Sequence, residues 1–168
     1  MTPALCIAAI AIFLVAAVTD WRSRRIPNKL VLALVALGLA RIVLIVVETG
    51  SVPYGDPLVA LAVFAAGALA FHLGMFGGGD VKLMAAGTLW TGAALADEFV
   101  IATLLAGGVL ALGYVFLGRL SRFRTGERAA VTLPYGIAIA AGGVITTRAM
   151  FAAPDGVALA QATLSSMN

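Results

Sequence analysis

Two aspartates, Asp20 and Asp80, are the residues of this sequence whose type and position could support chemistry. Asp20 follows a long apolar segment, and Asp80 follows three consecutive glycines, Gly77, Gly78 and Gly79. If the chain brings two carboxyl groups close together, they cannot both ionise cheaply, so one keeps its proton. The ionised group can then take a proton from an attacking water, while the protonated group polarises the carbonyl that is attacked. The pair therefore favours hydrolysis of a peptide bond.

The two aspartates differ in their positions on the expected helices. Asp80 would open a helix, where the helix dipole stabilises a negative charge, whereas Asp20 would close one, where the dipole opposes it. We therefore hypothesise that Asp80 is the ionised base and Asp20 the protonated partner, within a pair that titrates as a unit. The plainer alternative is that Asp80 only caps a helix and Asp20 only neutralises the arginines beside it.

The composition indicates a membrane protein. Of the 168 residues, 62% are hydrophobic and 11% are charged, with a mean hydropathy of +1.06, whereas soluble domains carry roughly a quarter charged residues. We expect one transmembrane domain over residues 1–168, and the formal charge of +3 is too small to indicate nucleic-acid binding. The single cysteine, Cys6, and the single histidine, His72, leave no disulfide or histidine metal site to build, so no metal and no cofactor are expected.

Apolar segments of about 20 residues match the thickness of the hydrocarbon core and predict an all-α bundle of six transmembrane helices. The segments cover about residues 3–19, 29–47, 57–75, 81–96, 99–118 and 132–150. The fourth is short and follows the glycines, which sit poorly inside a helix. We expect it to begin below the membrane surface, where protein or water must cover its backbone. Residues 151–168 are expected to be a loop that could continue as a surface helix.

Two polar residues in or just before the second segment, Asn28 and Arg41, are expected to have structural roles only. Asn28 follows Pro27 and is expected to cap this helix. Arg41 lies toward its far end, and we expect the long side chain to reach the interface near Glu48. The first segment has no basic region before it, so a removable signal peptide is not expected.

The loops between these segments alternate in charge. The second and fourth loops contain acids and no bases, whereas the first, third and fifth contain Arg22, Arg24, Arg25, Lys29, Lys82, Arg119, Arg122, Arg124 and Arg128. Because cytoplasmic loops carry an excess of lysine and arginine, we expect the odd loops in the cytoplasm and both termini outside it. Asp20 and Asp80 would then lie at the cytoplasmic ends of their helices.

Three motifs resemble those of a known family. Gly77-Gly78-Gly79-Asp80 fits the Gly-x-Gly-Asp signature of intramembrane aspartyl proteases, and its continuation Val81-Lys82-Leu83 is similar to that of type IV prepilin peptidases. Asp20 with Arg25-Ile26-Pro27-Asn28 resembles the segment that carries the family's other catalytic aspartate, and Pro134-Tyr135-Gly136 resembles the stretch that opens its last helix. The chain looks most like the small pilus-assembly members that process Flp-type pilins.

The resemblance implies a membrane aspartic endopeptidase of the bacterial inner membrane, which removes the short basic leader of a prepilin at the cytoplasmic face. Asp20 and Asp80 would be catalytic, and Gly77, Gly78 and Gly79 would shape the site. Lys82, Pro134, Tyr135 and Gly136 match family positions that could position the substrate or serve packing alone. The prepilin's own transmembrane helix and the lipid bilayer are the implied partners.

One departure from the family pattern narrows the activity. Larger members carry a cytoplasmic insertion with paired cysteine motifs that is associated with N-methylation of the new pilin terminus. This sequence has one cysteine and a first loop of only about ten residues, so the resemblance implies peptidase activity without methyltransferase activity.

A different class of function uses the same residues. Paired carboxylates in a membrane can bind cations or relay protons in a transporter, and a small bundle can serve as a pilus-assembly scaffold. Against transport, the acids gather toward one side, without a chain of ionisable residues across the membrane. Against a scaffold, an anchor has no need of three glycines before an aspartate.

Overall fold

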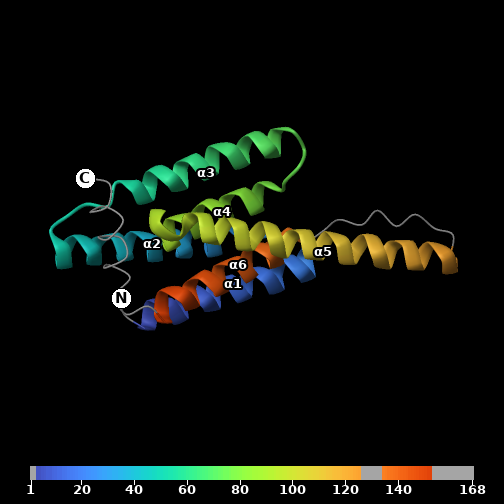
Figure 1. Cartoon of the computed structure of the whole chain (residues 1–168), viewed down its shortest axis with the longest axis horizontal. Helices are drawn as coiled ribbons and strands as arrows, with labels where there is room; N and C mark the ends of the chain where they lie inside the picture. The colour runs from blue at the N-terminus through green and yellow to red at the C-terminus, as the bar shows by residue number, and fades with distance from the viewer. Residues whose placement is uncertain (1–2, 126–133, 153–168) are drawn as a thin grey trace.

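A computed structural model describes residues 3–125 and 134–152 (Figure 1). In these residues the chain forms six α-helices, one short 3-10 helix and no strand. The α-helices are α1 (Pro3–Ser23), α2 (Asn28–Thr49), α3 (Gly55–His72), α4 (Gly78–Thr91), α5 (Ala96–Thr125) and α6 (Tyr135–Ala152), and the 3-10 helix η1 (Ala93–Leu95) joins α4 to α5. The predicted all-α bundle is confirmed. Residues 153–168, expected to be a loop or surface helix, lie outside the described part.

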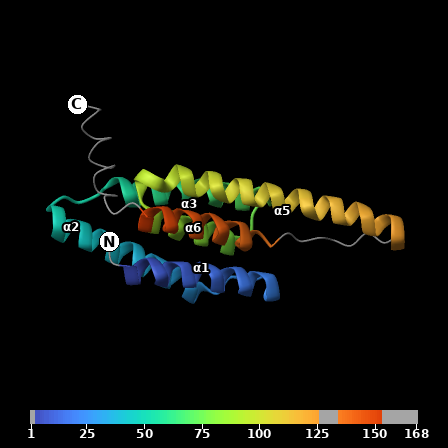
Figure 2. The same ribbon diagram turned by 60° about the horizontal axis from the view of Figure 1, so that its bottom comes forward.

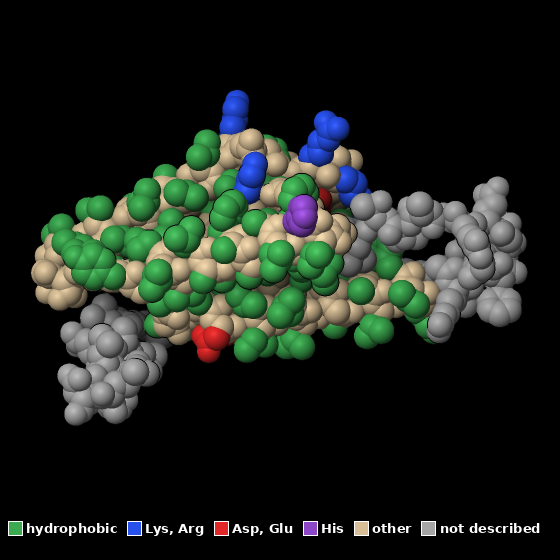
Figure 3. Space-filling model, turned by 90° about the horizontal axis from the view of Figure 1, so that it is seen from above, with side chains coloured by type: hydrophobic (Ala, Val, Ile, Leu, Met, Phe, Trp, Pro, Cys, Tyr) green, Lys and Arg blue, Asp and Glu red, His purple; other side chains and the backbone are tan. Residues whose placement is uncertain are grey.

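Five segments of the described part are long and apolar enough to cross a membrane: α1, α2, α3, α6 and Ala93–Phe116, which includes most of α5. Hydrophobic side chains cover much of the face shown in Figure 3. Leu58 is 68% exposed and Leu105 is 66% exposed. Such a surface is stable against lipid and not against water. The chain is therefore a multi-pass membrane protein.

The remaining helix, α4, is short and central. Its 14 residues extend about 21 Å at ~1.5 Å per residue, less than a hydrocarbon core of about 30 Å. It packs against α2, α3 and α6, while α6 lies between α1 and α5 (Figure 2). Trp90 near its end is fully buried and donates its indole N–H to the Thr147 hydroxyl of α6 at 3.0 Å. Because other helices enclose α4, its ends need not reach the membrane surface.

The boundaries of α4 and α5 differ from the expected ones. α4 begins at Gly78, so two glycines and Asp80 form its first turn, and the chain reverses earlier, at Gly74 with a φ of 73°. α4 ends at Gly92, whose φ of 80° belongs to the left-handed region that favours glycine. α5 continues to Thr125, beyond the expected end at residue 118, because a helix can carry cations once it has left the hydrocarbon core.

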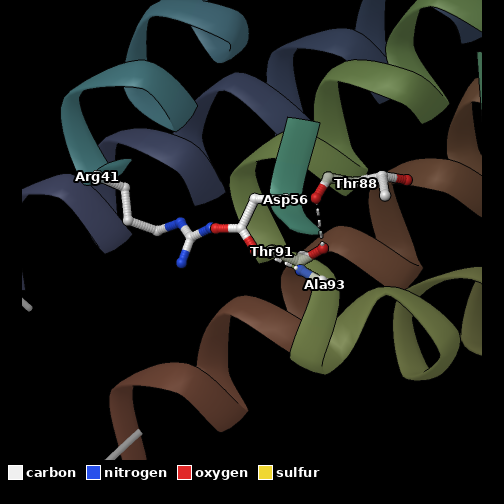
Figure 4. A network of polar contacts seen from close by, with 5 residues as sticks. All are labelled: Arg41, Asp56, Thr88, Thr91 and Ala93. Carbon is white, nitrogen blue, oxygen red and sulfur yellow. Dashed lines mark hydrogen bonds and ion pairs between the residues drawn. The ribbon is translucent and has the colours of Figure 1, made fainter. Parts of the chain in front are cut away.

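Arg41 does not reach the interface as expected; it is buried and forms an ion pair with Asp56 (Figure 4). Both residues are 7% exposed, and the second carboxylate oxygen of Asp56 accepts the N–H of Ala93 at 2.8 Å. The prediction failed because Asp56 was assigned to a loop, whereas it lies in the first turn of α3. A buried guanidinium is stable only with a counter-ion close to it, so Arg41 pairs with Asp56 instead of extending to the membrane interface. This network joins α2, α3 and η1 at one end of the bundle.

We expect Asp56→Ala to destabilise the fold by about 3–5 kcal/mol, because it leaves the Arg41 charge buried without a partner. Glu48→Ala, which removes an exposed acid at the end of α2, should change the stability by no more than about 0.5 kcal/mol. Thermal unfolding of the purified protein in detergent measures both effects. The double variant Arg41→Met with Asp56→Leu should recover most of the loss. Equal stability of Asp56→Ala and Glu48→Ala would contradict the role of the ion pair.

Candidate active site

Asp20 and Asp80 line one pocket of about 320 Å³. It lies where α1 ends and α4 begins, the right-hand end of these helices in Figure 1. The other lining residues are Arg24, Arg25, Ile26, Asn28, Gly77, Gly78, Gly79 and Lys82. Two carboxyl groups, three cations and the backbone of a glycine run thus surround a space that can hold several waters. The structure brings together the two aspartates that are 60 residues apart in the sequence.

Asp20 is held from the opposite side by α6. Its side chain lies in the last turns of α1, the residue is 6% exposed, and its Oδ2 accepts the backbone N–H of Gly136 at 2.8 Å. N–H groups in the first turn of a helix have no partner within the helix, so α6 supplies a free donor. A Cβ atom at position 136 would lie 2.8 Å from Oδ2 and 2.9 Å from Cβ of Asp20. Glycine is therefore required at position 136 by the close approach of the carboxyl group.

Asp80 lies in the first turn of α4, outside the five membrane-spanning segments. Burial, and then the negative charge of Asp20, raise the pKa of Asp80 to about 6, against an opposing hydrogen bond from the backbone of Gly77. A Cβ atom at position 77 would lie 2.8 Å from Oδ2 of Asp80. The charge of Asp20 therefore favours the protonated form of Asp80.

The other predicted site residues are divided between the pocket and its surroundings. Lys82 lines the pocket with an exposed side chain. Pro134 and Tyr135 do not line it: Pro134 is buried, and the Tyr135 ring packs edge-on against Phe76 with centroids 4.9 Å apart. Tyr135 still lies within electrostatic range of Asp80. His72 is exposed and not part of the lining.

Four lining residues were not among the predicted site residues: Arg24, Arg25, Ile26 and Asn28. Asn28 was expected to cap α2, but the N-cap is Pro27 and makes no side-chain hydrogen bond. Ile26 lies under the glycine run, 3.3 Å from where a Cβ of Gly79 would be. The sequence did indicate this loop, because Arg25, Ile26 and Asn28 belong to the motif that follows Asp20. The motif alone does not say that this loop folds across the start of α4.

These features define a class: a multi-pass membrane protein with a paired-aspartate pocket at one end of its bundle. Comparison with protein families then identifies it, because the profile of the type IV leader peptidase family matches residues 7–112. The chain belongs to this family, which is a family of peptidases acting on prepilin-type substrates. The match includes both aspartates and ends before α6. No curated protein and no solved structure gives a significant match.

We expect Gly136→Ala to reduce leader-peptidase activity about 10- to 100-fold, because the added methyl group displaces the Asp20 carboxyl by roughly an ångström. Gly108→Ala in α5 is the matched control, since a Cβ there meets nothing within 4 Å. Cleavage of a prepilin by each purified variant, at equal folded concentration, measures the effect. Full activity of Gly136→Ala would mean that the position of Asp20 does not matter for the reaction.

Proposed function

We propose that this peptidase is an aspartic endopeptidase that removes the short basic leader of Flp-type prepilins, with Asp20 and Asp80 as its catalytic pair. The observation that carries the proposal is that both carboxyl groups line one polar pocket and interact electrostatically. A peptide carbonyl and a water between them would meet an acid and a base together. Asp20 near the end of α1 and Asp80 in the first turn of α4 thus approach the pocket from two different helices.

In this mechanism the ionised carboxylate takes a proton from water while the hydroxide adds to the peptide carbonyl. The protonated carboxyl donates its proton to the carbonyl oxygen. The former carbonyl carbon then carries two hydroxyl groups as a gem-diol. When the intermediate collapses, the first carboxyl gives its proton to the leaving amine, the second carboxylate takes a proton from one gem-diol hydroxyl, and the C–N bond breaks. The pair thus ends with one proton, as it began, and no metal takes part in any step.

The contacts favour Asp20 as the base, the opposite of the assignment hypothesised from helix dipoles. Oδ2 of Asp20 accepts an N–H from Gly136, and a hydrogen bond to the charged form favours ionisation. Burial and the Asp20 charge raise the pKa of Asp80 to about 6, which favours its protonated form. The dipole argument considered each helix alone and therefore missed the donor from α6.

The pocket end of the bundle is proposed to face the cytoplasm. Arg22, Arg24, Arg25 and Lys82 lie at this end, where the positive-inside rule expects them. Pro3 and Ala152, the outer ends of α1 and α6, lie at the opposite end and would face outside the cytoplasm (Figure 1). In a bacterial inner membrane, a prepilin could keep its own helix in the lipid and bring its leader junction to the pocket.

We further propose that the chain does not methylate the new pilin terminus. The connection between α1 and α2 spans only residues 24–27, too short for the cysteine-containing insertion of larger family members. Incubation of the purified protein and a cleaved pilin with labelled S-adenosylmethionine should give no labelled pilin. Transfer of label by this chain would refute the proposal.

The deciding experiment is co-expression with a Flp-type prepilin. Asp20→Asn and Asp80→Asn should each abolish leader removal, because each leaves the pair without one of its two proton-transfer groups. Asp97→Asn is the matched control: Asp97 lies in the first turn of α5 and outside the pocket lining. Unchanged cleavage by both pocket variants would end the proposal. Proton or cation flux in proteoliposomes that both variants abolish would favour transport instead.

The pH dependence of the reaction follows from the pKa of Asp80. Above about pH 6, the value to which burial and the Asp20 charge raise this pKa, both carboxyls are ionised and no acid remains to polarise the carbonyl. We expect kcat/KM to fall about tenfold per pH unit above that midpoint, since one proton is lost. Initial rates of prepilin cleavage between acidic and neutral pH measure the profile. A rate that instead rises through pH 6 would assign the base role to Asp80.

A further inference from the structure

Arg24 has a backbone conformation that the rest of the described chain reserves for glycine. Its φ is 53°, and it is the single non-glycine residue with a positive φ in the described part of the chain. The other positive-φ residues are Gly50, Gly74 and Gly92. A Cβ atom disfavours this left-handed region, which is why helices usually end on glycine there. The sequence thus holds an arginine where glycine or asparagine would end α1 more easily.

This conformation ties Arg24 to Asp20. The backbone N–H of Arg24 donates to the carbonyl oxygen of Asp20 at 2.9 Å, which closes the last turn of α1. The side chains of both residues line the same pocket. The positive charge of Arg24 is close enough to act on the Asp20 carboxyl. The residue that ends the helix therefore also brings a positive charge to the pocket that the proposed base lines.

The neighbouring cations do not share this arrangement. Arg22 lies on α1 and is not part of the pocket lining. Arg25 and Lys82 line the pocket, but neither has the left-handed backbone of Arg24. If residue 24 served only to end α1, an uncharged residue would be enough. Strain that persists at a functional pocket indicates a role for the side chain that causes it.

We propose that Arg24 is a positioning residue, whose guanidinium in the shared pocket favours the carboxylate form of Asp20, the base of the reaction. This inference rests on the proposed function of the aspartate pair. Arg24 acts together with the Gly136 N–H, so that a charge and a hydrogen-bond donor approach one carboxylate from two elements. It transfers no proton itself, because a guanidinium stays protonated throughout the physiological range. The proton of the attacking water goes to Asp20 alone.

The test separates the backbone of residue 24 from its charge. Arg24→Gly keeps the left-handed turn, which glycine prefers, and removes the guanidinium; Arg24→Lys keeps a positive charge. We expect Arg24→Gly to fold as stably as the wild type and to lose roughly threefold to tenfold in kcat with little change in KM. Arg24→Lys should recover most of this loss. Arg22→Gln, a neighbouring cation outside the pocket lining, should behave as the wild type.

Chemical rescue provides a readout that a purely structural role would not move. Guanidinium chloride, added to Arg24→Gly well below denaturing concentration, should raise the rate of Flp-type prepilin cleavage. Urea, which has a similar shape and no charge, and sodium chloride at equal ionic strength should not. If Arg24→Gly fails to fold, Arg24→Asn, which also tolerates the turn, takes its place.

Several results would overturn the inference. A wild-type kcat in Arg24→Gly would mean that Arg24 only ends α1. An effect confined to KM would mean that Arg24 contacts the substrate. Rescue by urea equal to that by guanidinium would exclude a role for the charge. These outcomes are distinct from failure of the proposed function, which would appear as activity in Asp20→Asn or Asp80→Asn whatever Arg24 does.

Discussion

The fold depends on one constraint: a helix too short to cross the membrane must be enclosed by others that do. α4 has 14 residues, and hydrocarbon cannot satisfy the backbone groups at its two ends. Its neighbours α2, α3 and α6 therefore cover it. Arg41 of α2 and Asp56 of α3 lie near its C-terminal end, and Asp20 of α1 lines the pocket at its N-terminal end. A central short helix brings polar chemistry into the bundle without exposing it to lipid.

The two ends of α4 meet opposite kinds of polar site. At the C-terminal end, the Arg41–Asp56 ion pair is closed, and its second oxygen is occupied by the Ala93 N–H. At the N-terminal end, Asp20 and Asp80 line an open pocket in which like charges oppose each other. Paired opposite charges fix helices in place, whereas paired carboxyls leave a proton to share. The closed end holds the short helix, while the other end keeps an open pocket.

Much of this arrangement could be predicted from the sequence. Hydropathy gave the helices, because a segment of about 20 apolar residues has few alternatives in lipid. The three motifs gave the family, which the match over residues 7–112 confirms. Both aspartates could be identified because each belongs to a motif at the end of an apolar segment, the glycine run before Asp80 and Arg25-Ile26-Pro27-Asn28 after Asp20. The catalytic roles of Asp20 and Asp80 stay predictions until variants are assayed.

By itself, the sequence determined which segments are helices, that they belong in a membrane, and to which family they belong, since these properties depend on local composition and spacing. Only the tertiary structure decided what each charge meets. Arg41 pairs with a residue assigned to a loop, Gly136 donates to an aspartate 116 residues away, and Arg24 lines the same pocket as that aspartate. The physical reason is that a charge in a low-dielectric interior is controlled by its nearest partner, and partners on different helices meet only when the bundle is assembled.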